Sequence, residues 1–119
     1  MDDSLAHLAS LALAFRDERD WKQFHRPKDL ALGLVAEVGE LAELFLWKAD
    51  EDLADVARDE AMRQRLGEEL SDVLIYLLYL AEDAGIDLGA ACRAKLAVNA
   101  AKYPVEKARG SARKYTELD

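Results

Sequence analysis

Residues 37–45 read EVGELAELF and lie inside a longer stretch whose apolar residues recur with helical spacing. That spacing places the carboxylate of Glu37 on the same seam as four leucines, which are Leu30, Leu34, Leu41 and Leu44. We therefore expect Glu37 to point near a core rather than into open water. Glu40 follows about one helical turn later on a neighbouring part of the same face. The stretch predicts a core-facing helix that carries two acids.

A second pair of acids, in the segment 69–72 (ELSD), repeats this arrangement. Glu69 lies among the apolar residues of another helical pattern, and Asp72 stands about one turn further along. An ionised carboxylate among apolar neighbours is strongly unfavourable unless it is protonated, paired or bound to a cation. Four such acids would repel one another unless divalent cations neutralised them. The pattern alone leaves two alternatives open, a metal site or ordinary salt bridges to Arg and Lys.

The composition of the whole chain indicates a single all-α domain. The 119 residues are 51% hydrophobic and include only six glycines and two prolines, which suits long helices and disfavours strands. A net charge of −8 disfavours binding to a nucleic acid polymer or to an anionic membrane. Cys92 is the only cysteine, so an intrachain disulfide is excluded. With no signal peptide or long apolar run in the sequence, we expect a cytoplasmic protein.

Periodicity and helix-breaking residues predict the boundaries of the main elements. Ser4 is expected to cap a first helix that runs to the charged segment 16–20, and a loop with two aromatic residues should follow. Further helices are expected at about 28–48, 61–84 and 87–103. A short helical connection is expected at 53–60, between the second and third helices of the chain. We expect residues 1–104 to form the all-α catalytic domain and residues 105–119 to form a tail that is irregular or fastened onto a partner subunit.

The types of acid and the positions of the histidines indicate which metal such a site would prefer. Ligands that offer only oxygen favour a hard cation, with Mg²⁺ first and Mn²⁺ as a substitute. Helical di-iron sites add a Glu-x-x-His motif on each of two helices. Neither His7 nor His25 follows an acid at that spacing, so a di-iron protein is not predicted.

The acidic segments resemble a known family. The stretch 37–45, Trp47-Lys48 and the segment 68–77 (EELSDVLIYL) are similar to the MazG-like all-α nucleoside triphosphate pyrophosphohydrolases, and most similar to the dCTP pyrophosphatase branch. Asp20-Trp21 and Gln23-Phe24-His25 fit the same pattern. The resemblance continues through the segments 99–104 (NAAKYP) and 113–118 (RKYTEL), and so covers nearly the whole chain.

This resemblance implies a fold, an assembly and a reaction. The fold is a four-helix-bundle-like subunit that oligomerises through its helices, as a homotetramer built as a dimer of dimers. The reaction is the Mg²⁺-dependent hydrolysis of a (deoxy)nucleoside triphosphate, either dCTP or a modified dCTP, to the monophosphate and pyrophosphate, and it would cleanse the nucleotide pool. The implied metal ligands, which are also the catalytic residues, are Glu37, Glu40, Glu69 and Asp72. Glu43 and Glu68 lie beside them, and the motif gives neither a role.

The resemblance also implies contacts with the substrate, in which the tryptophans border the base and the other residues hold sugar or phosphates. These residues are Trp21, Trp47, Tyr76, Lys95, Asn99, Lys102 and Tyr103. Structural roles compete, since the tyrosines could pack in a core, the lysines could be solvated and the tryptophans could seal a subunit interface. Ala12 stands where vertebrate members of the branch are expected to have a histidine. If that histidine reads the base, selectivity for cytosine is relaxed here.

Two other functions compete with hydrolysis. A non-catalytic helical module could sense nucleotides or dock a protein through its aromatic loop, but such a module has no need of four clustered acids. A relative that acts on phosphoribosyl nucleotides in histidine synthesis is a weaker candidate, because the tryptophans and the C-terminal signature speak against it.

Overall fold

A computed structural model of the chain describes residues 3–53, 56 and 58–119. Its elements are helices, and the described residues include no strand, which confirms the predicted all-α class. The chain forms two compact units, residues 1–86 and 87–119. In the described part of the chain, no helix is both long and apolar enough to cross a membrane.

The first helix and the loop after it follow local signals in the sequence. Helix α1 spans Leu5–Glu18, and the Ser4 hydroxyl oxygen accepts a hydrogen bond of 3.2 Å from the backbone N–H of His7, as the predicted cap requires. The predicted loop contains one 3₁₀ turn, Lys22–Phe24. Helix α2 then begins at Pro27, a residue whose fixed φ suits the first helical position.

Helix α2 spans Pro27–Glu43, so the prediction that it reaches Lys48 is wrong. After Glu43 the backbone changes to i→i−3 bonding, because the N–H of Leu44 donates to the Leu41 carbonyl and that of Phe45 donates to Ala42. Trp47 then adopts a positive φ of 61°, which turns the chain away from the helix axis. Apolar residues continue through this turn, so their periodicity does not indicate where the helix ends.

Helix α4 spans Glu60–Asp83 and ends as predicted at Gly85. The N–H of Ile86 donates to the Ala81 carbonyl and that of Gly85 donates to Glu82, while Gly85 supplies the positive φ of 67° that this termination requires. The short helix α3 (Asp50–Leu53) precedes α4. The prediction of a helical connection at 53–60 is wrong in its bounds, because among the described residues of that segment only Leu53 and Glu60 are helical. Residues 54, 55 and 57 of that connection lie outside the described residues.

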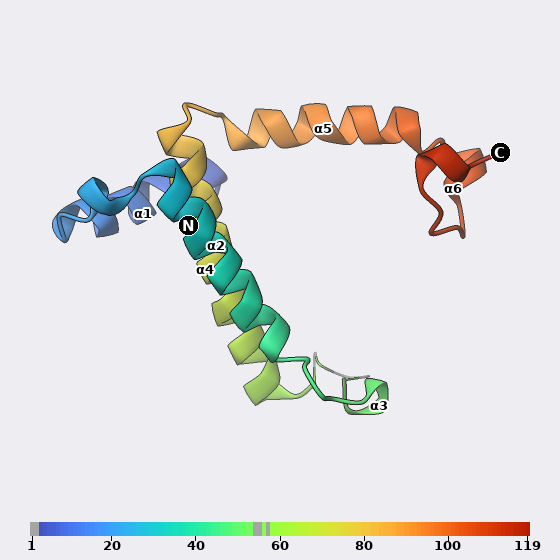
Figure 1. Cartoon of the computed structure of the whole chain (residues 1–119), viewed down its shortest axis with the longest axis horizontal. Helices are drawn as coiled ribbons and strands as arrows, with labels where there is room; N and C mark the ends of the chain where they lie inside the picture. Colours follow the sequence, from blue (N-terminus) through green and yellow to red (C-terminus); the bar gives the residue numbers. More distant parts are fainter. Residues whose placement is uncertain (1–2, 54–55, 57) are drawn as a thin grey trace. The chain divides into compact units, whose positions relative to one another are not determined.

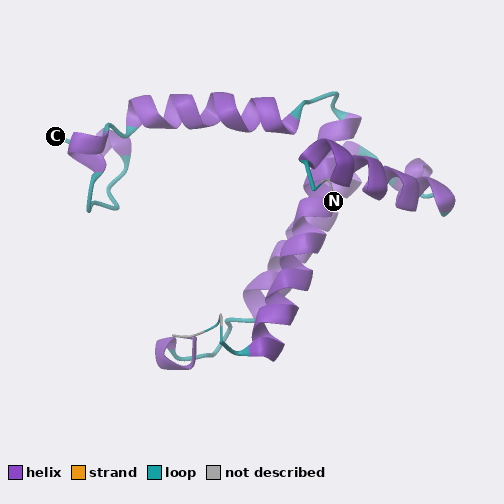
Figure 2. Ribbon diagram, turned by 180° about the vertical axis from the view of Figure 1, so that it is seen from behind, coloured by secondary structure: helices purple, strands orange, loops and turns teal. Residues whose placement is uncertain are grey.

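Helices α2 and α4 run antiparallel and side by side, and α1 packs against α4 (Figures 1 and 2). Leu30, Ala12 and Tyr79, one residue from each of these three helices, are buried together. The seam predicted along α2 is partly confirmed, since Leu30 and Leu44 are buried while Leu34 and Leu41 are half-buried. The two long helices thus hold the acids of α2 and α4 on facing surfaces.

The second unit begins with helix α5 (Leu88–Lys102), which Asp87 caps and which ends before Pro104, as predicted. The tail that follows is more regular than expected, because it contains the one-turn helix α6 (Val105–Ala108) and the 3₁₀ turn Tyr115–Glu117. The ring of Tyr115 lies 6.0 Å from that of Tyr103 and 4.8 Å from the Lys102 ammonium nitrogen. The tail is therefore folded back on the end of α5.

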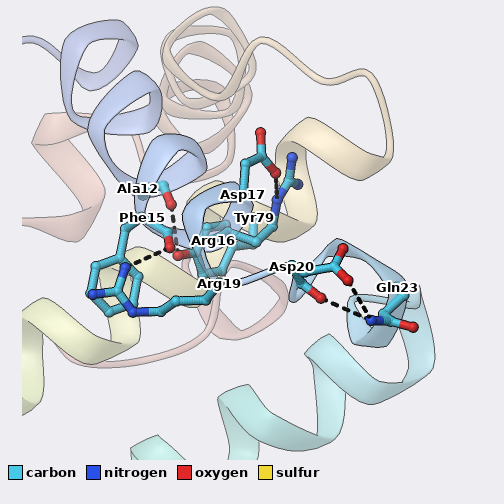
Figure 3. A network of polar contacts seen from close by, with 8 residues as sticks. All are labelled: Ala12, Phe15, Arg16, Asp17, Arg19, Asp20, Gln23 and Tyr79. Atoms are coloured by element: carbon cyan, nitrogen blue, oxygen red, sulfur yellow. Dashed lines mark hydrogen bonds and ion pairs between the residues drawn. The ribbon is translucent and has the colours of Figure 1, made fainter.

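We expect Tyr79→Phe to lower the free energy of unfolding by about 1 kcal/mol, a typical value for a lost buried hydrogen bond. The Tyr79 hydroxyl donates to the carbonyl oxygen of Ala12 at 2.8 Å, and this bond joins α4 to α1 (Figure 3). Urea denaturation followed by circular dichroism measures the change. Tyr115→Phe, in the second unit, is the control, and an equal loss in both variants would contradict a specific role for the Tyr79 bond.

Candidate functional site

Three of the four predicted metal ligands lie together between α2 and α4. Glu37 and Glu40 come from α2 and Glu69 from α4, and each offers a carboxylate oxygen within 4.8 Å of the others. The turn of α2 brings its two acids onto one side, and the antiparallel packing of α2 and α4 places Glu69 opposite them. The arrangement could hold a metal ion through oxygen atoms alone.

Asp72, the fourth predicted ligand, lies just beyond this cluster on α4. Its charge raises the pKa of Glu37 and of Glu69, so it belongs to the same electrostatic group. Asp72 also borders a polar hollow of about 680 Å³ on one face of α4, whose other lining residues are Gln64, Gly67, Glu68 and Ser71. The cluster therefore continues along α4 from Glu69 into an open polar surface.

The acids of the cluster are held in an environment that disfavours their charge. Burial raises the pKa of Glu37 and of Glu69, and the neighbouring charge of Glu40 raises both further. The Oε2 atoms of Glu37 and Glu69 are shielded from solvent and have no hydrogen-bond partner among the described residues.

The ion pairs of the described residues bear on the choice between a metal site and ordinary salt bridges. The ion pairs recorded in the described ranges join Arg16 to Asp17 and Arg19 to Glu18, and neither includes an acid of the cluster. The salt-bridge interpretation thus has no partner there, whereas a hard divalent cation would satisfy both the unpaired oxygens and the crowded charge.

An apolar cavity of about 570 Å³ adjoins the acids and shares Ser71 and Asp72 with the polar hollow. Its walls come from α1, α4 and the loop between α1 and α2. The remaining lining residues are Leu8, Leu11, Ala12, Phe15, Trp21, His25, Leu74, Ile75, Tyr76, Leu78 and Tyr79. A cavity of this size and polarity is typical of a small-molecule site, and Asp72 stands where it meets the charged region.

Two aromatic side chains at one edge of the cavity lie beside the guanidinium of Arg19. The rings of Phe15 and Trp21 meet edge to face with their centroids 5.8 Å apart. The Arg19 guanidinium lies 3.6 Å from the Phe15 ring centroid and donates a hydrogen bond of 2.8 Å to the Phe15 carbonyl oxygen (Figure 3). These contacts place Trp21 beside Phe15 at the edge of the cavity.

Sequence reasoning gave no site role to three of the lining aromatic residues: Phe15, His25 and Tyr79. The His25 ring packs on that of Tyr79 with centroids 4.6 Å apart, and its burial lowers the His25 pKa and favours the neutral imidazole. One signal was present for α4, because Tyr76 and Tyr79 follow Asp72 at helical spacing on the same side. Nothing local indicated that α1 and the loop would close over that side.

The other residues that were predicted to contact the substrate do not line this cavity. Trp47 is 93% exposed and is not among the residues that line the cavity, whereas Trp21 and Tyr76 are. The second unit contains Lys95, Asn99, Lys102 and Tyr103, all on α5 or at its end. Asn99 and Lys102 are half-buried within that unit and Lys95 is exposed. Their substrate contacts stay predictions.

The chain is similar to a known protein family and to a solved structure. Residues 34–118 match the MazG-like family. The chain is 50% identical to the bovine (Bos taurus) protein dCTP pyrophosphatase 1 and 49% identical to the human (Homo sapiens) one, over 98% of this chain and 69% of each relative. The crystal structure of a pyrophosphatase from Archaeoglobus fulgidus DSM 4304 superimposes with a TM-score of 0.75 at 37% identity, over 87% of this chain and 95% of that one.

Proposed function

The chain belongs to the MazG-like family, and we propose that it hydrolyses a deoxynucleoside triphosphate, dCTP or a modified dCTP, to the monophosphate and pyrophosphate. The observation that carries this proposal is the acid cluster beside an apolar cavity. The shielded, unpaired oxygens of Glu37 and Glu69 favour a bound cation, and Asp72 links the cluster to the cavity. The acid cluster, with a bound cation, suits a triphosphate, and the apolar cavity suits the aromatic face of a base.

We propose Mg²⁺ as the physiological cation, held by Glu37, Glu40, Glu69 and Asp72, with Mn²⁺ as a substitute. When bound, such a cation supplies Lewis-acid activation and offsets the negative charge of the triphosphate. The acids themselves bind the cation and fix its place relative to the cavity. A carboxylate of this group could also accept a proton from the attacking water.

The cavity is proposed to hold the nucleoside. Trp21 offers an aromatic face at its edge, and Tyr76 forms part of its wall. Lys95, Asn99, Lys102 and Tyr103 are proposed to contact sugar or phosphates, as the family resemblance implies. Within the second unit, Lys102 lies over the ring of Tyr115. Trp47 is proposed to border the base, although its own chain leaves it exposed.

We further propose that the chain assembles as a homotetramer, a dimer of dimers. Few apolar side chains are fully buried in the described residues, and large ones such as Leu32, Val35 and Leu70 are at least half exposed. A chain of this length needs a larger buried apolar surface than that for stability, and association of subunits would provide it.

The proposed reaction is tested by incubating the protein with Mg²⁺ and each dNTP in turn, including dCTP with a substituent at position 5, and identifying the products. Pyrophosphate and the monophosphate should appear in equal amounts, and only when a divalent cation is present. Release of orthophosphate without pyrophosphate would overturn attack at the α-phosphate. Tight nucleotide binding without turnover in any divalent metal would favour a nucleotide sensor instead.

A further inference from the structure

Gly33 on α2 lies against the ring of Tyr76 on α4. A Cβ atom added at Gly33 would stand 2.8 Å from Cζ and 3.0 Å from the hydroxyl oxygen of Tyr76. Both distances are shorter than ordinary van der Waals contact, so a side chain at this position would displace the ring. At Gly39, on the same helix, an added Cβ would meet no atom within 4 Å in the described part of the chain. The lack of a side chain thus has a specific packing consequence at Gly33.

The ring of Tyr76 forms a wall shared by two spaces. It lines the apolar cavity of about 570 Å³, and it also lines a smaller hollow of about 310 Å³. Trp21 and His25 border both spaces as well, while Asp29 and Leu30 border only the smaller one. Because α2 stands on one side of the ring and both spaces border the ring, a ring pushed away from Gly33 moves toward these spaces.

We propose that Gly33 is a specificity-determining residue, which lets Tyr76 lie back against α2 and so sets the largest base that the cavity admits. This inference rests on the proposed function, since it assigns the cavity to the nucleoside. Gly33 touches no substrate in this scheme and acts through Tyr76. The substrate class that it favours is nucleotides with bulky bases, such as pyrimidines substituted at position 5 or purines.

The size of the expected effect follows from the behaviour of apolar pockets. One methylene group more or less in such a pocket changes discrimination between substrates by roughly 10-fold or more. We therefore expect Gly33→Ala to lower kcat/KM for a bulky nucleotide by about 10-fold relative to dCTP. The loss should arise mainly in KM, because the acids of the cluster are left in place.

The experiment compares dCTP, dCTP with a bulky 5-substituent, and dATP as substrates for the wild type and Gly33→Ala. Gly39→Ala is the matched control, the same substitution on the same helix, and should leave the ratios between substrates unchanged. A second comparison is made in a Tyr76→Leu background, where Gly33→Ala should no longer change the ratios because the ring is gone. Unchanged ratios in Gly33→Ala, a uniform loss for all substrates, or an effect that persists without Tyr76 would each overturn the proposal.

Two further measurements keep the outcome decisive. If Gly33→Ala does not fold, Tyr76→Leu alone must raise the ratio of bulky to small substrates, and an unchanged ratio overturns the proposal. Dissociation constants of non-hydrolysable analogues of the same nucleotides are measured in parallel. A size-dependent change in binding without any turnover would uphold the role of Gly33 and overturn the proposed reaction. Turnover with unchanged ratios between the substrates would uphold the proposed reaction and overturn the role of Gly33.

Discussion

Glu40→Gln is expected to lower the rate of pyrophosphate release by more than about 100-fold, because loss of a metal ligand exceeds the 10- to 100-fold effect of losing a group that only supports one. The variant should keep its helical circular dichroism, since Glu40 is exposed on α2. Without metal it should also unfold at a higher temperature than the wild type. The reason is that the charge of Glu40 raises the pKa of both Glu37 and Glu69, and removing it relieves that repulsion.

The stability measurement separates the two interpretations that the sequence left open. If Glu40 were part of a salt bridge, Glu40→Gln would lower stability in chelator rather than raise it. Asp72→Asn should behave like Glu40→Gln in activity, because Asp72 joins the cluster to the cavity. Glu82→Gln, near the end of α4, removes the same charge from an exposed position away from the cluster and should retain full activity. Loss of activity in Glu82→Gln would indicate a general effect of net charge.

The helices and the acid pairs could be predicted because their signals are local. Ser4, Asp87 and Gly85 act within one helical turn of the ends that they define, and the spacing of Glu37 and Glu40 fixes their common side once a helix is given. The end of α2 could not be predicted in this way. Its apolar pattern runs on into turns whose backbone bonding differs, and the positive φ of Trp47 has no signature in that residue type.

The cavity depended on contacts between residues far apart in the sequence. Ala12, Trp21 and Tyr79 meet only after α1 and the following loop have packed on α4, and no periodicity within one segment encodes that meeting. The contact of Gly33 with Tyr76 is of the same kind, because a helical glycine alone reads as a weak point and gains its meaning from the ring opposite. The spacing of the acids was enough to predict that they need a cation or another partner. It was not enough to predict the shape of the cavity beside them.

Mg²⁺ is expected to raise the melting temperature by roughly 10 °C at a concentration about 100 times its dissociation constant, because binding to the native state alone adds about 2.7 kcal/mol. The effect should depend on pH in a defined direction. In the folded protein the pKa values of Glu37 and Glu69 are raised above the ordinary 4.5, so the metal-free native state holds protons that the unfolded chain has released. Stability in chelator should therefore fall as pH rises from about 4.5 through the raised pKa values.

A bound cation takes the place of those protons, so the stabilisation by Mg²⁺ should grow over the same pH range in which the metal-free protein loses stability. Melting curves with Mg²⁺ or with chelator, recorded from pH 4.5 upward at constant ionic strength, test both trends. Equivalent ionic strength from NaCl is the control for simple screening, and Glu40→Gln should show a much smaller rise with Mg²⁺. An Mg²⁺ effect that was independent of pH, or equal in Glu40→Gln, would place the cation outside the acid cluster.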